Sequence, residues 1–566
     1  MTEAYAAFPS TLEKLQAACV SFLDQSKNKM NVERARERRS ELANFAGRFH
    51  EECGTLTPSV QERLEDLKNG NCIVLMTAHQ PNFFAYSGVL RKATLNFVLS
   101  KKIENILKVP VVTFFGIADQ DFTDDRWVRS CELPAVQRSG GRLSIELKLP
   151  DKLMLNKVPK PSRDLLSGWE SEIESWLNED IESIEKLCRK LGFRETCSVS
   201  SVSALHENLA SFWKIVEDSW ECSARYSDFN GFLMSKIVND AWGYDTVFAR
   251  FSECQQAFAD DFCFLLSHFK DYSRLLKEAK QTPTMEGVDS GVSDQEPFLV
   301  PFWYHCSCGS KAKLFLEESD GSLHGSGNCV LCQERYELDF GHQDSPDILR
   351  IASQISARAI SMALVFFNGL QPSCYVGGAA GLGYLAQARS VAEGLGILFP
   401  PVAVWRPYDR YAGVGQVEAS LEVRRVCDDS GARNLSEARD ILSSRISAIY
   451  ERIKEIEASK KSLIEELKKS PDDRELREKL RSVSVSRTEM CRSSHLSEVH
   501  GELRIITNAS AVSTLIPSVI DYAVNIGLKE TSDQWIRHLS EKGSLESDVW
   551  LESVLSKTEK LDWTLR

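Results

Sequence analysis

The chain has 566 residues, of which 43% are hydrophobic and 26% are charged, a composition typical of ordinary globular proteins. The formal net charge of −13 argues against a general nucleic-acid-binding protein, because such proteins need a basic face to neutralise phosphates. No run of about 18 apolar residues occurs, and the N-terminus lacks a basic start followed by an apolar stretch. We therefore expect neither a membrane helix nor a secretory signal.

The chain contains 16 cysteines, a number that would suit disulfides, a metal site or redox chemistry. A chain of this length can bury a large core without covalent cross-links. We therefore expect reduced cysteines and a cytoplasmic protein. Most of the cysteines stand singly in apolar segments, where a free cysteine behaves as a small hydrophobic residue; examples are Cys72, Cys188, Cys263 and Cys374.

Residues 1–68 are expected to form an N-terminal helical segment of two helices. Next, residues 72–76 form an apolar run typical of a buried strand, residues 88–107 show a helical period, and residues 109–118 form a second apolar run. Strand, helix and strand in about 45 residues predict a βαβ unit. The fold is therefore expected to be α/β, with a parallel sheet and right-handed crossovers.

Two segments, 69–299 and 343–432, are expected to build one Rossmann-like core. Within the first, residues 164–280 are expected to be mainly helical, with several tryptophans in the core, and residues 281–296 to be a linker. The tryptophans are Trp169, Trp176, Trp213, Trp220 and Trp242. Within the second, we expect a helix at 348–367, a strand at 373–376, a helix at 382–394 and a strand at 400–405.

Residues 433–500 show a pattern typical of an antiparallel coiled-coil hairpin. Apolar residues stand at positions 446, 449, 453, 456, 463 and 467, in steps of three and four that Lys460 interrupts. Residues 470–473 break the helix, and an amphipathic helix follows. The hairpin is expected either to make a homodimer or docking contact, or to be a helical pair without a partner. Residues 501–566 are expected to form a compact α/β cap.

Two closely spaced cysteine pairs, separated by 20 residues, stand within residues 300–342. A CxC–x20–CxxC spacing lets four thiolates meet one tetrahedral Zn²⁺ at about 2.3 Å. Since four thiolates leave no open coordination position, we expect a zinc ribbon whose metal stabilises the fold. A disulfide pair, an Fe–S or catalytic site, and His305 as a substitute ligand are the alternatives. The expected ligands are Cys306, Cys308, Cys329 and Cys332.

Polar residues and glycines follow three predicted strands. His79 and Gln80 follow the first strand, Asp119 and Asp121 follow the second, and a glycine-rich stretch at residues 375–383 follows the third. Ligands of open α/β sheets bind at the carboxyl ends of the strands. A histidine there could be a general base or orient a phosphate, and two aspartates could hold an amine or Mg²⁺. The glycines would let the backbone approach an anion at a helix N-terminus.

These motifs resemble a known family. The string Thr77-Ala-His-Gln-Pro-Asn82, with Gly88 and Lys92 after it, looks like the HQP segment of the cysteine-adding enzymes of bacillithiol biosynthesis. The acidic loop after residue 118 resembles that family's strand end. The stretch with Tyr375-Val-Gly-Gly378 and Tyr384-Leu-Ala-Gln387 resembles its YVGG and YxAQ strings. The match is sharp over about 100 residues. Gln120 replaces the histidine of the family's acidic loop, and a zinc module is absent from the family pattern.

The resemblance implies a Rossmann-like core, a dimer through the coiled coil, and addition of cysteine to the amine of a glucosamine–malate conjugate with ATP or ADP. It implies catalytic roles for His79, Gln80, Asp119 and Asp121, the two aspartates binding the amine or moving a proton. Substrate or nucleotide would contact the other motif residues. Those residues are Asn82, Tyr86, Gly88, Lys92, Tyr375, Gly377, Gly378, Tyr384 and Gln387.

Three functions are therefore compatible with the sequence. The first is a cysteine-ligase-like enzyme acting on a small-molecule amine, with a related acceptor or acyl donor left open. The second is a nucleotide-binding transferase of the adenylyl-transfer type. The third is a non-catalytic scaffold that uses the zinc ribbon and the hairpin as contact surfaces.

Overall fold

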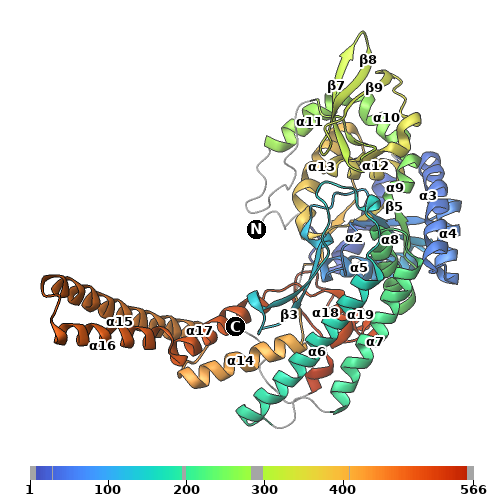
Figure 1. Ribbon diagram of the computed structural model, residues 1–566. Helices are drawn as coiled ribbons and strands as arrows, with labels where there is room; N and C mark the ends of the chain where they lie inside the picture. Colours follow the sequence, from blue (N-terminus) through green and yellow to red (C-terminus); the bar gives the residue numbers. More distant parts are fainter. Residues whose placement is uncertain (1–7, 29, 194–198, 282–297, 407, 558–566) are drawn as a thin grey trace.

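A five-stranded parallel sheet lies at the centre of the computed structural model, which describes residues 8–28, 30–193, 199–281, 298–406 and 408–557 (Figure 1). The strand order is β12-β11-β1-β2-β5, and every neighbouring pair is parallel. The strands are β1 (Ile73–His79), β2 (Val111–Ile117), β5 (Val247–Arg250), β11 (Cys374–Val376) and β12 (Val402–Ala403). The prediction of an α/β fold with a parallel sheet is confirmed.

The strand order places β1 in the middle of the sheet. The chain adds β2 and β5 on one side of β1 and later returns to add β11 and β12 on the other side. This is the 3-2-1-4-5 order of doubly wound sheets, whose switch point lies between the first and fourth strands. Here that point lies between β1 and β11, where Leu75 pairs with Cys374 and Thr77 with Val376. Ligands of such folds bind beyond the carboxyl ends of the strands at this position.

The two faces of the sheet belong to different hydrophobic cores. Leu75 of β1 lies in a core shared with α5 (Ser87–Leu107), whereas Val74 and Met76 lie in a second core shared with α12 (Ala359–Leu370). Successive side chains of a strand point to opposite faces. The side chain of His79, two positions beyond Thr77, therefore points to the α5 face.

Three helices precede the sheet, where two were expected. They are α2 (Leu12–Ser26), α3 (Val32–Cys53) and α4 (Pro58–Asn69). The second and third are separated because Gly54 adopts a left-handed conformation at the end of α3, and Thr57 accepts a hydrogen bond from the backbone of α4 as its N-cap.

Residues 164–280 are mainly helical, as predicted, but they also contain the strand β5. This four-residue strand is completely buried, and so short an apolar run carries no period that separates it from a buried helix. Of the predicted core tryptophans, Trp220 is half-buried and the other four are buried. The connection between β2 and β5 contains the hairpin β3 (Ser130–Pro134) and β4 (Arg142–Glu146), then α6 (Arg163–Leu191), α7 (Val199–Cys222) and α8 (Tyr226–Ser235).

Between β5 and β11 the chain builds a second, antiparallel sheet that contains both cysteine pairs. The expected helix at 348–367 begins only at Ala359, because Ser356 and Ala357 pair with β6 instead. The linker predicted at 281–296 lies outside the described residues except for Gln281, which ends a helix. The elements are α9 (Phe251–Cys254), α10 (Ala259–Ser267), α11 (Phe269–Gln281), β6 (Phe302–His305), β7 (Lys311–Ser319), β8 (Ser322–Cys329), β9 (Arg335–His342) and β10 (Ile355–Ala357).

A pair of antiparallel helices projects from the body of the molecule, at the end opposite the antiparallel sheet (Figure 1). The helices are α15 (Leu435–Lys469) and α16 (Arg474–Cys491), joined across the predicted break. An ion pair of 2.6 Å joins Arg487 to Glu457 across the pair. Ile446 and Ile453 are buried, whereas α16 has no buried residue. Coiled-coil packing of this pair stays a prediction.

The remaining elements complete the second half of the sheet and the C-terminal region. Helix α13 (Leu382–Leu395) connects β11 with β12, and the predicted strand at 400–405 is only the two residues of β12. None of the described helices is long and apolar enough to cross a membrane. The other elements are α14 (Val414–Ser430), α17 (Ser494–Val512), α18 (Val519–Asn525), α19 (Leu528–Glu541) and the short parallel pair of β13 (Asp409–Arg410) with β14 (Val549–Trp550).

Candidate active site and metal centre

His79 is the last residue of β1 and lies at the switch point. Its Nδ1–H donates to the carbonyl oxygen of Gln80 at 3.1 Å, so Nε2 carries the free lone pair and accepts from the Tyr86 hydroxyl at 3.3 Å. Burial, together with a smaller effect of the nearby Lys92 ammonium, lowers the pKa of His79 to about 3. The imidazole is therefore neutral at pH 7 and is a hydrogen-bonding group rather than a cation.

Lys92, on α5, contacts the carboxyl end of β1. Its ammonium donates to the carbonyl oxygen of Ala78 at 3.1 Å, and burial lowers its pKa to about 7. A Cβ on Gly378 would lie 3.7 Å from the Lys92 Nζ, so the glycine loop after β11 borders this ammonium directly. A buried ammonium that has no carboxylate partner among the described residues is suited to an anionic ligand.

Asp121 joins the loops that follow β1 and β2. Burial raises the pKa of its carboxyl group, while the Lys311 ammonium and a hydrogen bond from the Gln80 side chain hold it down. The Asp121 charge in turn contributes to the raised pKa of Tyr384, whose hydroxyl accepts a hydrogen bond from Tyr375. The acidic loop, the HQP segment and the start of α13 thus meet around one carboxylate.

Asp119 occupies a different environment from Asp121. Its carboxylate is fully buried and accepts hydrogen bonds from the backbone nitrogen of Ser252, at 2.8 Å, and from the Ser252 hydroxyl. Burial raises the pKa of Asp119 to about 6, against the effect of these hydrogen bonds. Both oxygens of the Asp119 carboxylate therefore have partners in the first turn of α9.

Tyr86 forms the wall beside His79. Its ring lies edge-on to the imidazole, with centroids 5.8 Å apart, and packs at 4.4 Å against Trp127. Gly88 permits this position, since a Cβ there would lie 2.6 Å from the Tyr86 ring. Gly88 of the sequence motif is thus required because the Tyr86 ring lies too close to its backbone to leave room for a side chain.

The other motif residues surround the same strand ends. Asn82 is buried, and among the described residues neither polar atom of its side chain meets a partner at good hydrogen-bond geometry, although the amide is close enough to raise the pKa of His79. Such an amide at the switch point fits a polar ligand. Gly377 donates its backbone N–H to Ala403 at 2.8 Å, and Gln387 is buried on α13.

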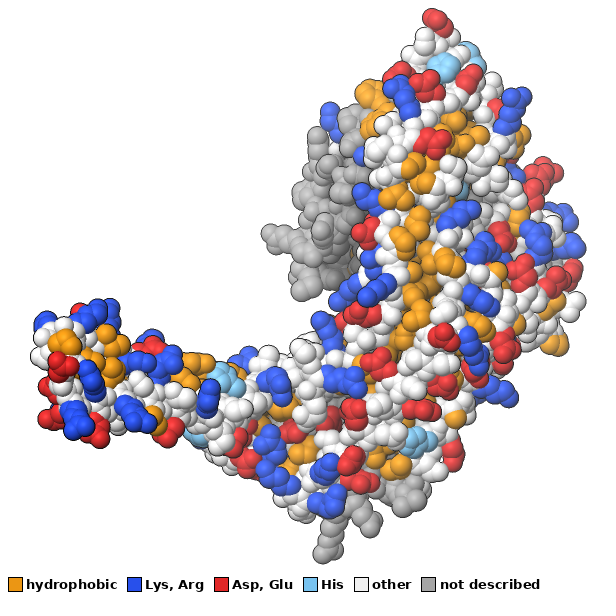
Figure 2. All heavy atoms as spheres, viewed as in Figure 1, with side chains coloured by type: hydrophobic (Ala, Val, Ile, Leu, Met, Phe, Trp, Pro, Cys, Tyr) orange, Lys and Arg blue, Asp and Glu red, His pale blue; other side chains and the backbone are white. Residues whose placement is uncertain are grey.

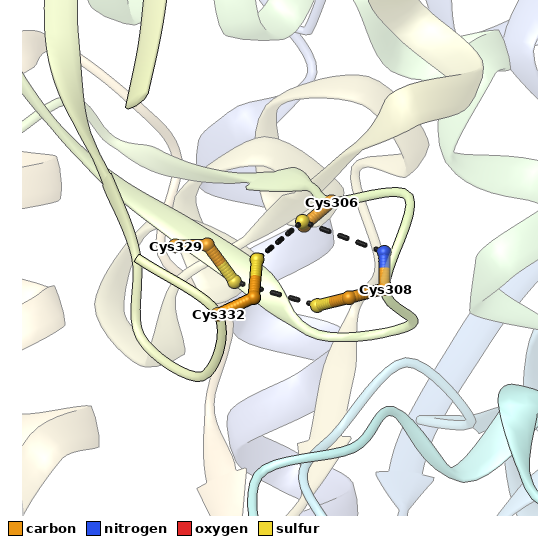
Figure 3. A group of neighbouring side chains, drawn as sticks. All are labelled: Cys306, Cys308, Cys329 and Cys332. Carbon is orange, nitrogen blue, oxygen red and sulfur yellow. Dashed lines mark hydrogen bonds between the residues drawn. The ribbon is translucent and has the colours of Figure 1, made fainter. Parts of the chain in front are cut away.

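The four predicted metal ligands converge in the ribbon (Figure 3). Their sulfur atoms all lie within 4.8 Å of one another. Cys306 Sγ is 3.4 Å from Cys332 Sγ, and Cys308 Sγ is 3.6 Å from Cys329 Sγ. Four thiolates at about 2.3 Å from a tetrahedral zinc have sulfurs about 3.8 Å apart. The group could therefore hold a metal ion such as zinc.

Further contacts hold the thiols in place. The backbone N–H groups of Cys308 and Leu331 approach Cys306 Sγ and Cys329 Sγ at 3.5 and 3.4 Å, and the Tyr336 hydroxyl donates to Cys306 Sγ at 3.1 Å. Donors of this kind stabilise thiolates and orient metal ligands. Gly309, at a φ of 88°, makes the turn after the first pair.

Two site residues were missed from the sequence. Lys311, on β7, comes from the predicted zinc module and contacts the acidic loop, whereas Trp127 covers Tyr86. Lys311 lies three residues after Cys308, and nothing in the local sequence distinguishes it from an ordinary surface lysine. Only the contact of the ribbon with the acidic loop shows where this lysine lies.

No protein-family model and no curated protein sequence matches this chain. One solved structure that resembles it, from Campylobacter jejuni, is described as that of a putative arginyl tRNA synthetase, with 10% identity over 82% of this chain and 92% of that one. The TM-score of 0.22 is too low for this likeness to carry an argument about fold or function.

Proposed function

We propose that this protein is a nucleotide-dependent ligase that forms a carbon–nitrogen bond. It would join the carboxyl group of cysteine, or of a related amino acid, to the amine of a small acceptor such as a glucosamine–malate-type conjugate. The observation that carries this proposal is that three loops resembling the cysteine-adding enzymes of bacillithiol biosynthesis follow adjacent strands. The loops follow β1, β2 and β11, at the switch point of a doubly wound sheet.

The charges at the site suit the two substrates. The Asp121 carboxylate would bind the acceptor ammonium, whereas Lys92 and the amides after Gly377 would bind a carboxylate or phosphate. Neutral His79 would orient the donor by accepting a hydrogen bond at Nε2 in place of the Tyr86 hydroxyl. ATP would first transfer a phosphoryl or adenylyl group to the donor carboxylate, releasing ADP or pyrophosphate. The Asp121 carboxylate would take one proton from the bound ammonium, and the neutral amine would attack the carbonyl carbon. A C–N bond forms, the bond from that carbon to the phosphate or adenylate oxygen breaks, and the second amine proton leaves with the released phosphate or AMP.

Two further assignments belong to this proposal. Mg²⁺ would accompany the nucleotide, and zinc would occupy the four-cysteine group as a structural ion. Asp119 would hold the acidic loop in place rather than contact substrate, because its oxygens already accept from Ser252.

We also propose that the helical pair of α15 and α16 makes a homodimer. Two apolar residues of this pair that lie outside the heptad positions, Ile464 and Val485, are 36% and 49% exposed within one chain. Hydrophobic side chains lie among charges of both signs along this arm and near its tip (Figure 2). A second copy would cover these side chains.

The experiment that tests the ligase is an assay of ATP consumption and of product mass with cysteine and a panel of amines. The wild-type protein is expected to consume ATP only when both substrates are present. His79→Ala is expected to lower the rate about 100-fold or more. The matched control is His324→Ala, which changes an exposed histidine on β8 and should leave the rate unchanged. Equal rates for wild type and His79→Ala would contradict the proposal.

A further inference from the structure

The metal-binding ribbon, residues 302–342, contacts the acidic loop, residues 118–125, through one buried lysine. The Lys311 side chain is 3% exposed, and its ammonium donates to the carbonyl oxygen of Gln120 at 2.8 Å. The same ammonium lies 4.3 Å from the centroid of the Phe122 ring. A lysine at a ribbon surface would ordinarily keep its charge in water. Here it is directed into the candidate active site.

A second connection runs through the backbone. The carbonyl oxygen of Gly309 accepts from the Met154 N–H at 3.0 Å. The next two amides of that segment bond to the acidic loop, Leu155 donating to Asp121 O at 2.9 Å and Asn156 donating to Asp119 O at 2.8 Å. Residues 154–156 therefore connect the turn at Gly309 with the loop that contains both aspartates.

Both connections start beside one metal ligand. Gly309 directly follows Cys308, and Lys311 is three residues from it, at the start of β7. Two backbone hydrogen bonds close the turn after Cys306, from Gly309 N to Cys306 O at 3.0 Å and from Cys306 N to Ser310 O at 2.9 Å. An ion bound by the four thiolates would join this turn to the second cysteine pair and make it more rigid.

We infer that Lys311 is a positioning residue for Asp121, and that the metal-bound ribbon holds Lys311 and the acidic loop in the geometry of the site. The metal would thus support the site from outside it, although it has no coordination position for a substrate. The inference rests on the proposed function only in assigning Asp121 to the reaction. The structural coupling itself can be measured without any substrate.

Hydrogen–deuterium exchange of the full-length zinc-loaded protein tests the coupling. Removal of zinc with a chelator is expected to make the amides of residues 154–156 and of the acidic loop exchange about tenfold faster. The amides of residues 112–115 in β2 should be unaffected. Lys311→Met, with zinc retained, is expected to speed exchange in the acidic loop alone. Lys313→Met, two residues further along β7, is the matched control and should change neither segment.

A spectroscopic measurement tests the positioning role separately. The infrared band of the protonated Asp121 carboxyl group is identified by its loss in Asp121→Asn. Because the Lys311 ammonium favours the ionised carboxylate, this band is expected to persist to a higher pH in Lys311→Met than in the wild type. Lys313→Met should leave the titration unchanged. If Lys311 only filled space, its replacement by methionine would not change the pH at which Asp121 titrates.

The outcomes separate this inference from the proposed reaction. Unchanged exchange in the acidic loop and an unchanged titration of Asp121 in Lys311→Met would overturn the inference, whatever the ligase assay shows. If chelation unfolds the whole chain, the zinc-loaded Lys311→Met protein still decides the question. Faster exchange together with a negative ligase assay would support the coupling and contradict the reaction.

Discussion

The Asp119 carboxylate accepts a hydrogen bond from the backbone nitrogen of Ser252 at 2.8 Å, and this bond joins the acidic loop to the first turn of α9. Asp121, two residues later, instead accepts a hydrogen bond from the Gln80 side chain, and the Lys311 ammonium lowers its pKa. The two carboxylates of one short motif thus have separate hydrogen-bond partners, Ser252 for Asp119 and Gln80 for Asp121.

This difference predicts opposite effects of substitution. Asp119→Ala is expected to destabilise the protein by about 1–2 kcal/mol, because the first turn of α9 loses its acceptor. Asp121→Asn is expected to keep the stability close to wild type while abolishing the proposed ligase activity. Urea denaturation and the ATP assay measure the two effects. Loss of stability in Asp121→Asn without such loss in Asp119→Ala would reverse the assignment.

Lys92 predicts a dependence of stability on pH. Burial lowers its pKa to about 7 in the folded protein, from an ordinary value of 10.5. Between these values the unfolded chain binds more protons, so this group makes stability rise with pH. Lys92→Met should therefore be more stable than wild type at pH 6, by an amount on the order of 3 kcal/mol, and the gap should close toward pH 10. Urea midpoints across this range measure the gap, and a constant gap would contradict the prediction.

The four-cysteine group predicts a stoichiometric metal. Purified protein is expected to contain about one zinc per chain, and Cys332→Ser is expected to lose it. Since Cys332 is exposed, this substitution removes a ligand without opening a cavity. Elemental analysis and limited proteolysis within residues 302–342 measure the loss. Cys222→Ser, also at an exposed cysteine, is the control and should retain the metal.

The exposed apolar side chains of the helical pair predict a change in oligomeric state. Ile464→Glu combined with Val485→Glu is expected to convert a dimer to a monomer, because two buried charges would face a second copy. Light scattering measures the mass, and circular dichroism checks the helices. Lys468→Glu, a charge change at an exposed position of α15, should leave the dimer intact. A wild-type monomer would refute the dimer proposal.

Much of the candidate site follows from short sequence patterns. The apolar run before His79 predicts a buried strand, and the spacing of the four cysteines predicts their convergence. Both are local properties of the chain, since a strand end or a paired-cysteine turn is specified within a few residues. The βαβ unit likewise follows from three consecutive periodic segments.

Other features have no local signal. Strand β5 is four residues long and lies between helices, and the helix expected from 348 begins at Ala359 because the residues before it pair with β6. The hydrogen-bond partner of Asp119 is Ser252, which lies 133 residues away. Local patterning contains no information about such a partner.

The 566 residues by themselves determine an acidic α/β chain with a four-cysteine group and polar strand ends, because composition, period and spacing are properties of neighbouring residues. Only the tertiary structure decides that β1 and β11 are neighbours, that Lys311 reaches the acidic loop from 191 residues away, and that Asp119 is used by α9. These relationships come from the packing of distant segments. The pKa and the hydrogen bonds of a buried charged group depend on the partners that this packing places beside it.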